Sequence, residues 1–349
     1  METAPTKVDS ERRGRIGILT LQRPRALNAL DLEMVRDLTA ALDRWDRDDR
    51  IDAVVLRGAG DRGFCAGGDV RGLYDTLTGE HPEQVDTFFR AEYALNARIA
   101  EYRHPIVAFA DGITMGGGIG LAGHASHRVV TERSVLAMPE TRIGFTPDVG
   151  GSWLLARTPG RIGEYLALTG QSVGAADAIA AGLADHHVPS GRLDGLLSDL
   201  AGGVDLERAI GAVAIDPAPG RLHVDRPWID VAFAQHTVAD IVDALRERPE
   251  DAAQDTAAQL ESLPPTALAV TLEAVRRARE LPDIRSALTQ EFGLVMWFAM
   301  TQPDLIEGIR AQLVDKDRSP RWSPGTREEL DDDLLDQAFA FTPPVPLGL

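Results

Sequence analysis

The sequence predicts an α/β fold in its first part and a mostly α-helical region after it. Short apolar segments typical of strands alternate with amphipathic segments typical of helices up to about residue 190. Glycine-rich turns follow several of these strands, and helical periodicity dominates the remainder. We therefore expect a core over residues 1–190 and a helical C-terminal region over residues 191–349 packed on it, although no Gly/Ser-rich linker marks the boundary.

Several segments of the first part have the length and apolar content of strands. They are residues 15–21, 52–57, 105–110, 127–131 and 135–138. A helix is expected after Asp31, because apolar residues recur at three- and four-residue steps and Asp31 can cap the first turn. A shorter helix over residues 174–181 is stopped by Gly182, and a strand follows that ends at Val188.

The second part is dominated by helical periodicity. The expected helices cover residues 238–245, 252–263, 267–281 and 284–300. The tail from residue 315 to residue 349 is rich in proline and aspartate. This distribution indicates a helical addition to the α/β core, with no internal repeat.

The composition narrows the class of protein. The net charge of −18 argues against nucleic-acid binding, which needs a basic face, but a few local arginines can still hold phosphates. No apolar stretch is long enough for a membrane helix, so no membrane partner is expected. The segment Met1–Arg13 resembles neither a signal nor a transit peptide, which favours a cytoplasmic enzyme.

Few residues are candidates for metal binding or thiol chemistry. Cys65 is the single cysteine, and a small packing residue is its simplest role. The histidine pairs His124/His127 and His186/His187 do not complete a ligand set, so no metal site is expected.

Two glycine-rich loops can expose backbone amides to a ligand. The first is residues 63–69 (GFCAGGD), and the second is residues 111–120 (DGITMGGGIG). Each has a structural alternative, a tight turn for the first and close helix packing for the second. One N–H group from each loop, converging on a thioester carbonyl oxygen, would form an oxyanion hole that lowers the barrier by about 3 kcal/mol.

Two acidic residues follow in a segment of mixed apolar and turn character. Glu140 lies between apolar residues, where burial would favour a general base, although a helix cap or a surface carboxylate is the alternative. Asp148 lies eight residues further on, in a turn flanked by proline and glycine. By itself Asp148 is equally consistent with a turn former.

These three blocks, in this order, resemble the crotonase (enoyl-CoA hydratase/isomerase) superfamily over roughly residues 14–190. The resemblance implies a crotonase-type ββα spiral core whose two glycine-rich loops supply the oxyanion hole through the N–H groups of Gly68 and Gly117. It also implies that the coenzyme A ester is held by residues matching the family's binding positions: Arg25, Ala26, Ala66, Asp69 and Gly116.

One departure from the family pattern bears on the reaction. Hydratases of this family use two glutamates, and Gly120 stands where the first would be, so only Glu140 is kept. A single carboxylate with an oxyanion hole suits hydrolysis better than hydration. Segments over most of the chain resemble 3-hydroxyisobutyryl-CoA hydrolases, namely residues 88–96, 137–160, 164–170, 229–241 and 307–322.

The resemblance implies hydrolysis of a short-chain 3-hydroxyacyl-CoA thioester, with 3-hydroxyisobutyryl-CoA of valine catabolism as the favoured substrate. Glu140 would activate water or attack the carbonyl directly, and Asp148 would bind the 3-hydroxyl or orient the water. Glu92 matches a substrate-contacting acid, with a helix-surface glutamate as the alternative. No cofactor is expected, because coenzyme A is part of the substrate.

Other interpretations of the same residues stay open. An enoyl-CoA hydratase or isomerase is one, since isomerases of the family can work with one carboxylate. A non-catalytic acyl-CoA-binding protein is another, although Glu140, Asp148 and both loops are retained. Crotonase relatives often form trimers or hexamers, so the resemblance also leaves a homo-oligomer open.

Overall fold

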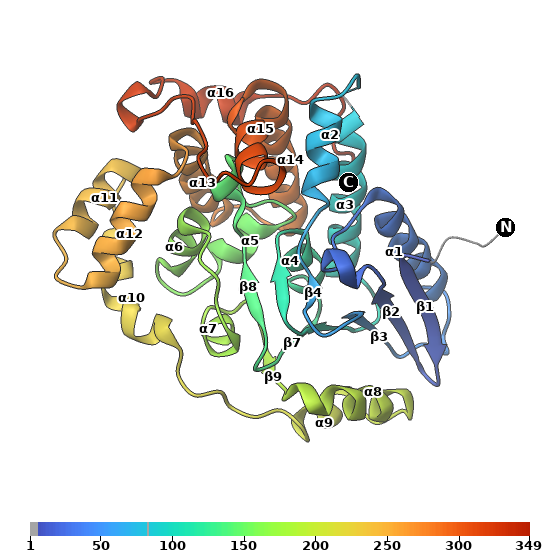
Figure 1. Ribbon diagram of the computed structural model, residues 1–349. Coiled ribbons are helices and arrows are strands. Elements are labelled where there is room, and N and C mark those ends of the chain that lie inside the picture. The colour runs from blue at the N-terminus through green and yellow to red at the C-terminus, as the bar shows by residue number, and fades with distance from the viewer. Residues whose placement is uncertain (1–5, 82–83) are drawn as a thin grey trace. The chain divides into compact units, whose positions relative to one another are not determined.

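Strands and helices alternate through the first 211 residues of the computed structural model, and the remainder is helical (Figure 1). The structure describes residues 6–81 and 84–349. The chain forms two units from interleaved segments. The first consists of Met1–Gly68, Ala91–Leu136 and Val173–Gly220, and the second of Asp69–Arg90, Ala137–Ser172 and Arg221–Leu349.

A mixed six-stranded sheet organises the first unit. Strand β1 (Val8–Arg13) pairs antiparallel with β2 (Ile16–Leu21), and every later neighbour pair in this sheet is parallel. The order is β1-β2-β3-β5-β7-β9, where the remaining strands are β3 (Ala53–Gly58), β5 (Ile106–Ala110), β7 (His127–Val130) and β9 (His186–His187). Parallel neighbours are far apart in the sequence, as helical crossovers require.

A second, three-stranded sheet is formed by short strands that alternate in the sequence with later strands of the larger sheet. Its order is β4-β6-β8, formed by β4 (Gly63–Cys65), β6 (Ile113–Met115) and β8 (Val135–Ala137). Strand β6 leads directly into helix α4 (Gly117–Ala122), which is made almost entirely of buried small and apolar residues. Both predicted glycine-rich loops therefore continue from strands of this sheet.

One face of the six-stranded sheet is covered by two short helices. Helices α8 (Leu193–Ala201) and α9 (Leu206–Gly211) contribute Leu196, Leu200 and Ile210 to a buried cluster with residues of β2, β3 and β5. Burying each such side chain contributes roughly 1.5–3 kcal/mol. These helices belong to the first unit, whereas the sequence predicts a division after residue 190.

The other elements of the first unit include the helix expected after Asp31. Helix α1 (Leu32–Trp45) begins there because the Asp31 carboxylate accepts the Met34 N–H at 3.0 Å. The remaining helical elements are η1 (Pro24–Ala26), the C-terminal part of α3 (Val85–Ala100), α7 (Ala175–Ala180) and η4 (Ser190–Arg192).

The second unit is mostly helical in its described residues. Before residue 173 it contains α2 (Val70–Leu77), the N-terminal part of α3, η3 (Glu140–Ile143), α5 (Gly151–Ala156) and α6 (Ile162–Thr169). Those after residue 220 are α10 (Arg221–Ala232), α11 (Val238–Arg246), α12 (Asp251–Ser262), α13 (Pro265–Ala278), α14 (Ile284–Thr301), α15 (Asp304–Ile309), the π-helical turn η5 (Arg310–Val314), η6 (Arg327–Glu329) and α16 (Leu334–Ala340).

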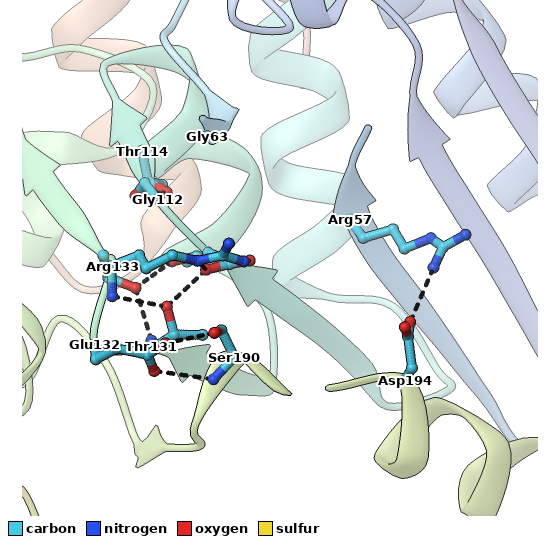
Figure 2. Close-up of polar contacts among 12 residues, drawn as sticks. Arg57, Gly63, Gly112, Thr114, Thr131, Glu132, Arg133, Ser190 and Asp194 are labelled. Atoms are coloured by element: carbon cyan, nitrogen blue, oxygen red, sulfur yellow. Dashed lines mark hydrogen bonds and ion pairs between the residues drawn. The ribbon is translucent and has the colours of Figure 1, made fainter. Parts of the chain in front are cut away.

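Polar contacts fix the turn between β7 and β8. Figure 2 shows Thr131, Glu132 and Arg133 of this turn with their partners. Thr131 Oγ1 donates to Asp111 Oδ1 at 2.6 Å, and Arg133 pairs with the same carboxylate. Glu132 accepts the Ser190 N–H at 2.9 Å. The bonds from Thr131 and Arg133 hold Asp111, at the start of the second glycine-rich loop, in place.

The predicted α/β fold is confirmed, and each strand and helix expected from periodicity is present within a few residues. Strand β1 was missed, because it lies in a polar segment where only Val8 is buried. Strand β1 is ordered by its backbone pairing with β2, which its own polar residues do not predict.

Two glycines in helices test how closely the chain packs. A Cβ at Gly118 would lie 2.2 Å from the Cys65 carbonyl oxygen, whereas a Cβ at Gly195 in α8 would meet no atom within 4 Å. Gly118→Ala is expected to destabilise the fold by several kcal/mol through overpacking against backbone. Gly195→Ala should instead stabilise it by about 0.5–1 kcal/mol, through helix propensity.

Urea unfolding of the two variants checks this pair. Equal free energies of unfolding would contradict the close approach at Gly118.

Candidate active site

The two glycine-rich loops of the first unit approach each other backbone to backbone. Gly67 (φ 108°) and Gly116 (φ 48°) adopt conformations that glycine tolerates and other residues rarely do. The Gly68 amide nitrogen lies 3.2 Å from the position that a Cβ would take at Gly117. Side chains at these positions would keep the loops apart, so the glycines permit the two peptides to meet.

The amides of Gly68 and Gly117 are suited to bind one acceptor. Gly117 is the first residue of α4, and the first amides of a helix have no acceptor within that helix. The first loop is held by a bond from the Leu30 N–H to the Gly67 carbonyl at 2.8 Å. The site that the sequence predicts for an oxyanion is therefore built from fixed backbone.

Glu92 lies next to these amides. Its side chain on α3 is only 2% exposed, and its Oε1 is 2.5 Å from the Cβ position of Gly117. The alternative of a helix-surface glutamate is therefore wrong. Cys65, in the first glycine-rich loop, is fully buried, and burial raises the pKa of its thiol to about 12. Such a thiol is a poor nucleophile at neutral pH, which fits a packing residue.

The residues expected to hold coenzyme A in the first unit share one neighbourhood. Arg25 and Ala26 form the exposed turn η1, and the Ala66 N–H donates to the Leu27 carbonyl at 3.0 Å. Gly116, of the same predicted set, is buried at the start of α4. Asp69 belongs to the second unit, where it caps α2 by accepting the Gly72 N–H at 3.2 Å.

Glu140 begins the 3₁₀ turn η3 in the second unit. It is 7% exposed, so the surface alternative is wrong, and it does not cap a helix but forms the first residue of one. The turn closes at Gly144 (φ 74°), whose Cα faces the Asp304 carbonyl of α15 so closely that a Cβ there would lie 2.4 Å from it. The backbone around Glu140 is thereby fixed.

Asp148 lies at a turn that another carboxylate organises. Glu291 of α14 is completely buried and accepts the Gly150 N–H at 2.6 Å, the Ser152 N–H at 2.8 Å and the Ser152 hydroxyl. Burial raises the pKa of Glu291 to about 8, and the charge of Asp148 adds to the rise, while the bonds from Ser152 and Gly150 oppose it.

Sequence reasoning missed two polar residues that shape these loops. Asn28 is fully buried and accepts the Arg23 N–H while donating to the Ala59 and Gly63 carbonyls. Glu291 falls within the helix predicted over residues 284–300, and no role was predicted for it. Its signal is a lone acid on a buried face, flanked by Leu288 and Val295 one turn before and after it.

The family is shown by comparison with known proteins. The profile of the family described as Enoyl-CoA hydratase/isomerase matches residues 16–339. The chain therefore belongs to this family. The 3-hydroxyisobutyryl-CoA hydrolase, mitochondrial, of Danio rerio is 38% identical to it over 97% of this chain and 90% of its own length.

Two solved structures share the whole fold. A carnitinyl-CoA dehydratase from Mycobacterium thermoresistibile is 41% identical, with a TM-score of 0.93 over 98% of each chain. An enoyl-CoA hydratase from Rhodobacter sphaeroides 2.4.1 is 41% identical, with a TM-score of 0.91 over 99% of this chain and 100% of its own. The predicted crotonase-type core with its helical C-terminal region is thereby confirmed.

The comparison with the relative from Danio rerio corrects the expected cellular location. The relative from Danio rerio is a mitochondrial enzyme by name, which points away from a cytoplasmic protein. The cytoplasmic expectation was wrong because it rested on the lack of targeting features in Met1–Arg13, and such a lack does not determine where an enzyme works.

The raised pKa of Glu291 predicts a pH-dependent stability. An unfolded glutamate titrates at about 4.3, so between that pH and about 8 the folded chain keeps a proton that the unfolded chain has released. The free energy of unfolding should fall as pH rises through this window, by at most about 1.4 kcal/mol per pH unit from this group.

Urea unfolding of the wild type and Glu291→Gln checks the pH dependence between about pH 6 and 8. The free energy of unfolding of the wild type, relative to that of Glu291→Gln, should fall as pH rises. A constant difference would mean that Glu291 is already ionised across the window.

Proposed function

We propose that the chain hydrolyses the thioester of 3-hydroxyisobutyryl-CoA, giving 3-hydroxyisobutyrate and coenzyme A. The relative from Danio rerio, which carries that name, is 38% identical over nearly the full length of this chain. The reaction class is thus acyl-CoA thioester hydrolysis within the enoyl-CoA hydratase/isomerase family. The proposed reaction needs no cofactor.

One observation carries the chemistry. The Gly68 nitrogen and a Glu92 carboxylate oxygen both lie within 3.2 Å of the Cβ position of Gly117. A backbone amide and an acidic side chain therefore border the same small region. A thioester oxygen there would accept from the Gly68 and Gly117 N–H groups as negative charge develops on it. Two preorganised donors are worth more in the transition state than in the ground state, which is what accelerates the reaction.

The proposed role of Glu140 is to deliver the nucleophile. It either takes a proton from water as the water oxygen attacks the carbonyl carbon, or attacks that carbon itself to form an anhydride that water then opens. In both routes the carbon–sulfur bond breaks and coenzyme A leaves as the thiolate. The burial of Glu140 supports the assignment, because charge interactions with a reacting group are stronger away from bulk water.

Asp148 and Glu92 are proposed to recognise the acyl part. Both carboxylates are almost fully buried, at 6% and 2% exposed, and buried acids usually serve a polar partner. The partner proposed for Asp148 is the 3-hydroxyl of the substrate. Alternatively, Asp148 orients the attacking water. The residues proposed to hold coenzyme A are Arg25, Ala26, Ala66, Asp69 and Gly116.

A second candidate is hydration or dehydration of an enoyl-CoA. The two solved structures at 41% identity are named as a dehydratase and a hydratase. Gly120 weighs against this candidate, because it leaves one glutamate where the family's hydratases use two. A free-thiol assay on 3-hydroxyisobutyryl-CoA, run beside the loss of enoyl absorbance from crotonyl-CoA, separates the candidates: only hydrolysis releases thiol.

Glu140→Gln tests the proposed catalytic role. The substitution keeps the shape and removes the base, so turnover in the thiol-release assay should fall about 10²- to 10⁴-fold. Binding of the coenzyme A ester, measured by calorimetry, should stay within a few-fold of the wild type.

Glu164→Gln is a matched control for Glu140→Gln. Glu164 of α6 is another fully buried carboxylate of the second unit, and it pairs with Arg161, just before α6, and Arg279, just after α13. It should turn over substrate at nearly the wild-type rate. Full activity in Glu140→Gln would refute the assignment.

A further inference from the structure

The Asp148 turn has an unusual backbone. The Gly151 N–H donates to the Asp148 carbonyl at 2.6 Å, closing a four-residue turn whose two central residues, Val149 (φ 54°) and Gly150 (φ 79°), are both left-handed. Glycine accepts this conformation, but a β-branched residue rarely does, and such strain costs on the order of 1–3 kcal/mol. The turn persists only if its surroundings hold it.

Glu291 is the group that holds it. Its two oxygens accept the N–H groups of Gly150 and Ser152, the residues on either side of Gly151. With the bond that closes the turn, three consecutive amides have fixed acceptors. The acceptor comes from the middle of α14, a helix that packs against α5.

The geometry points to Glu291 as a positioning residue of the proposed hydrolase: it acts through Asp148 by holding the strained turn that carries it. This inference rests on the proposed function, since it assigns Glu291 to the placement of a group that contacts substrate. Glu291 itself is sealed from solvent and bonded to protein groups, which excludes it as a substrate contact.

A glutamine cannot replace Glu291. One carboxylate oxygen faces Gly150 and the other faces Ser152, so both ends of the group must accept. An amide NH₂ donates and does not accept, whichever way the side chain is turned. Glu291→Gln therefore loses one anchor of the turn whether or not the glutamate carries a proton, while the volume of the side chain is kept.

The test is a double-mutant cycle in the thiol-release assay. Glu291→Gln should lower kcat about 10- to 100-fold and leave KM within about twofold, since small misplacement of a catalytic group carries costs of that size. In an Asp148→Asn background the same change should alter kcat less than about threefold, because the group it positions has been removed.

A merely structural residue would behave differently. Its loss would lower activity by the same factor in both backgrounds, and additive effects would therefore overturn the inference. Glu164→Gln is the control for losing a buried carboxylate of the same unit, and its kcat should stay near the wild-type value when assayed below its unfolding temperature.

Ser152→Ala keeps the test decisive if Glu291→Gln does not fold. It removes only the hydroxyl donor and retains both backbone bonds to Glu291. We expect kcat about 3- to 10-fold lower with KM unchanged, and no further loss in the Asp148→Asn background. An unchanged kcat in Ser152→Ala would contradict the inference.

The wild-type assay distinguishes failure of the proposed hydrolysis from failure of the positioning role of Glu291. A wild type that releases no thiol overturns the proposed hydrolysis and, with it, the inference. A wild type that releases thiol while Glu291→Gln and Ser152→Ala match it overturns the positioning role alone.

Discussion

The close approach of two stretches of bare backbone is the constraint on which the rest of the site depends. A Cβ at Gly118 would lie 2.2 Å from the Cys65 carbonyl oxygen, and a Cβ at Gly117 would lie 3.2 Å from the Gly68 nitrogen and 2.5 Å from Glu92 Oε1. No residue larger than glycine fits at Gly118 without moving backbone, and Gly67 and Gly116 also take left-handed conformations. The proposed oxyanion site therefore depends on packing as well as on chemistry, because the same glycines allow the two loops to meet.

The second unit holds acidic side chains in buried positions and in fixed orientations. Glu140 begins a short 3₁₀ turn that is locked at Gly144, and Asp148 precedes a strained turn anchored by Glu291. Both turns depend on C-terminal helices, α15 for the first and α14 for the second. This dependence gives a physical reason for a helical region that a simple α/β core would not need.

Much of this could be predicted from the sequence, where local patterns decide the outcome. Apolar runs and the Asp31 cap give the strands and α1, and the glycine clusters mark both loops. Long-range pairings could not be predicted. Strand β1 is ordered by its partner rather than by its own polar residues, and α8 and α9 join the first unit through an apolar cluster that only folding creates. The role of Glu291 could not be predicted because its hydrogen-bond partners lie about 140 residues away in the chain.

The most direct measurement is the infrared spectrum of the thioester carbonyl in the bound state. 3-Hydroxyisobutyryl-CoA labelled with carbon-13 at that carbonyl, bound to Glu140→Gln so that it persists, isolates the band of interest. Two amide donors at Gly68 and Gly117 polarise the carbonyl, so its stretch should move to lower wavenumber than in free substrate. A bound carbonyl that absorbs at the same position as in water would contradict the oxyanion site.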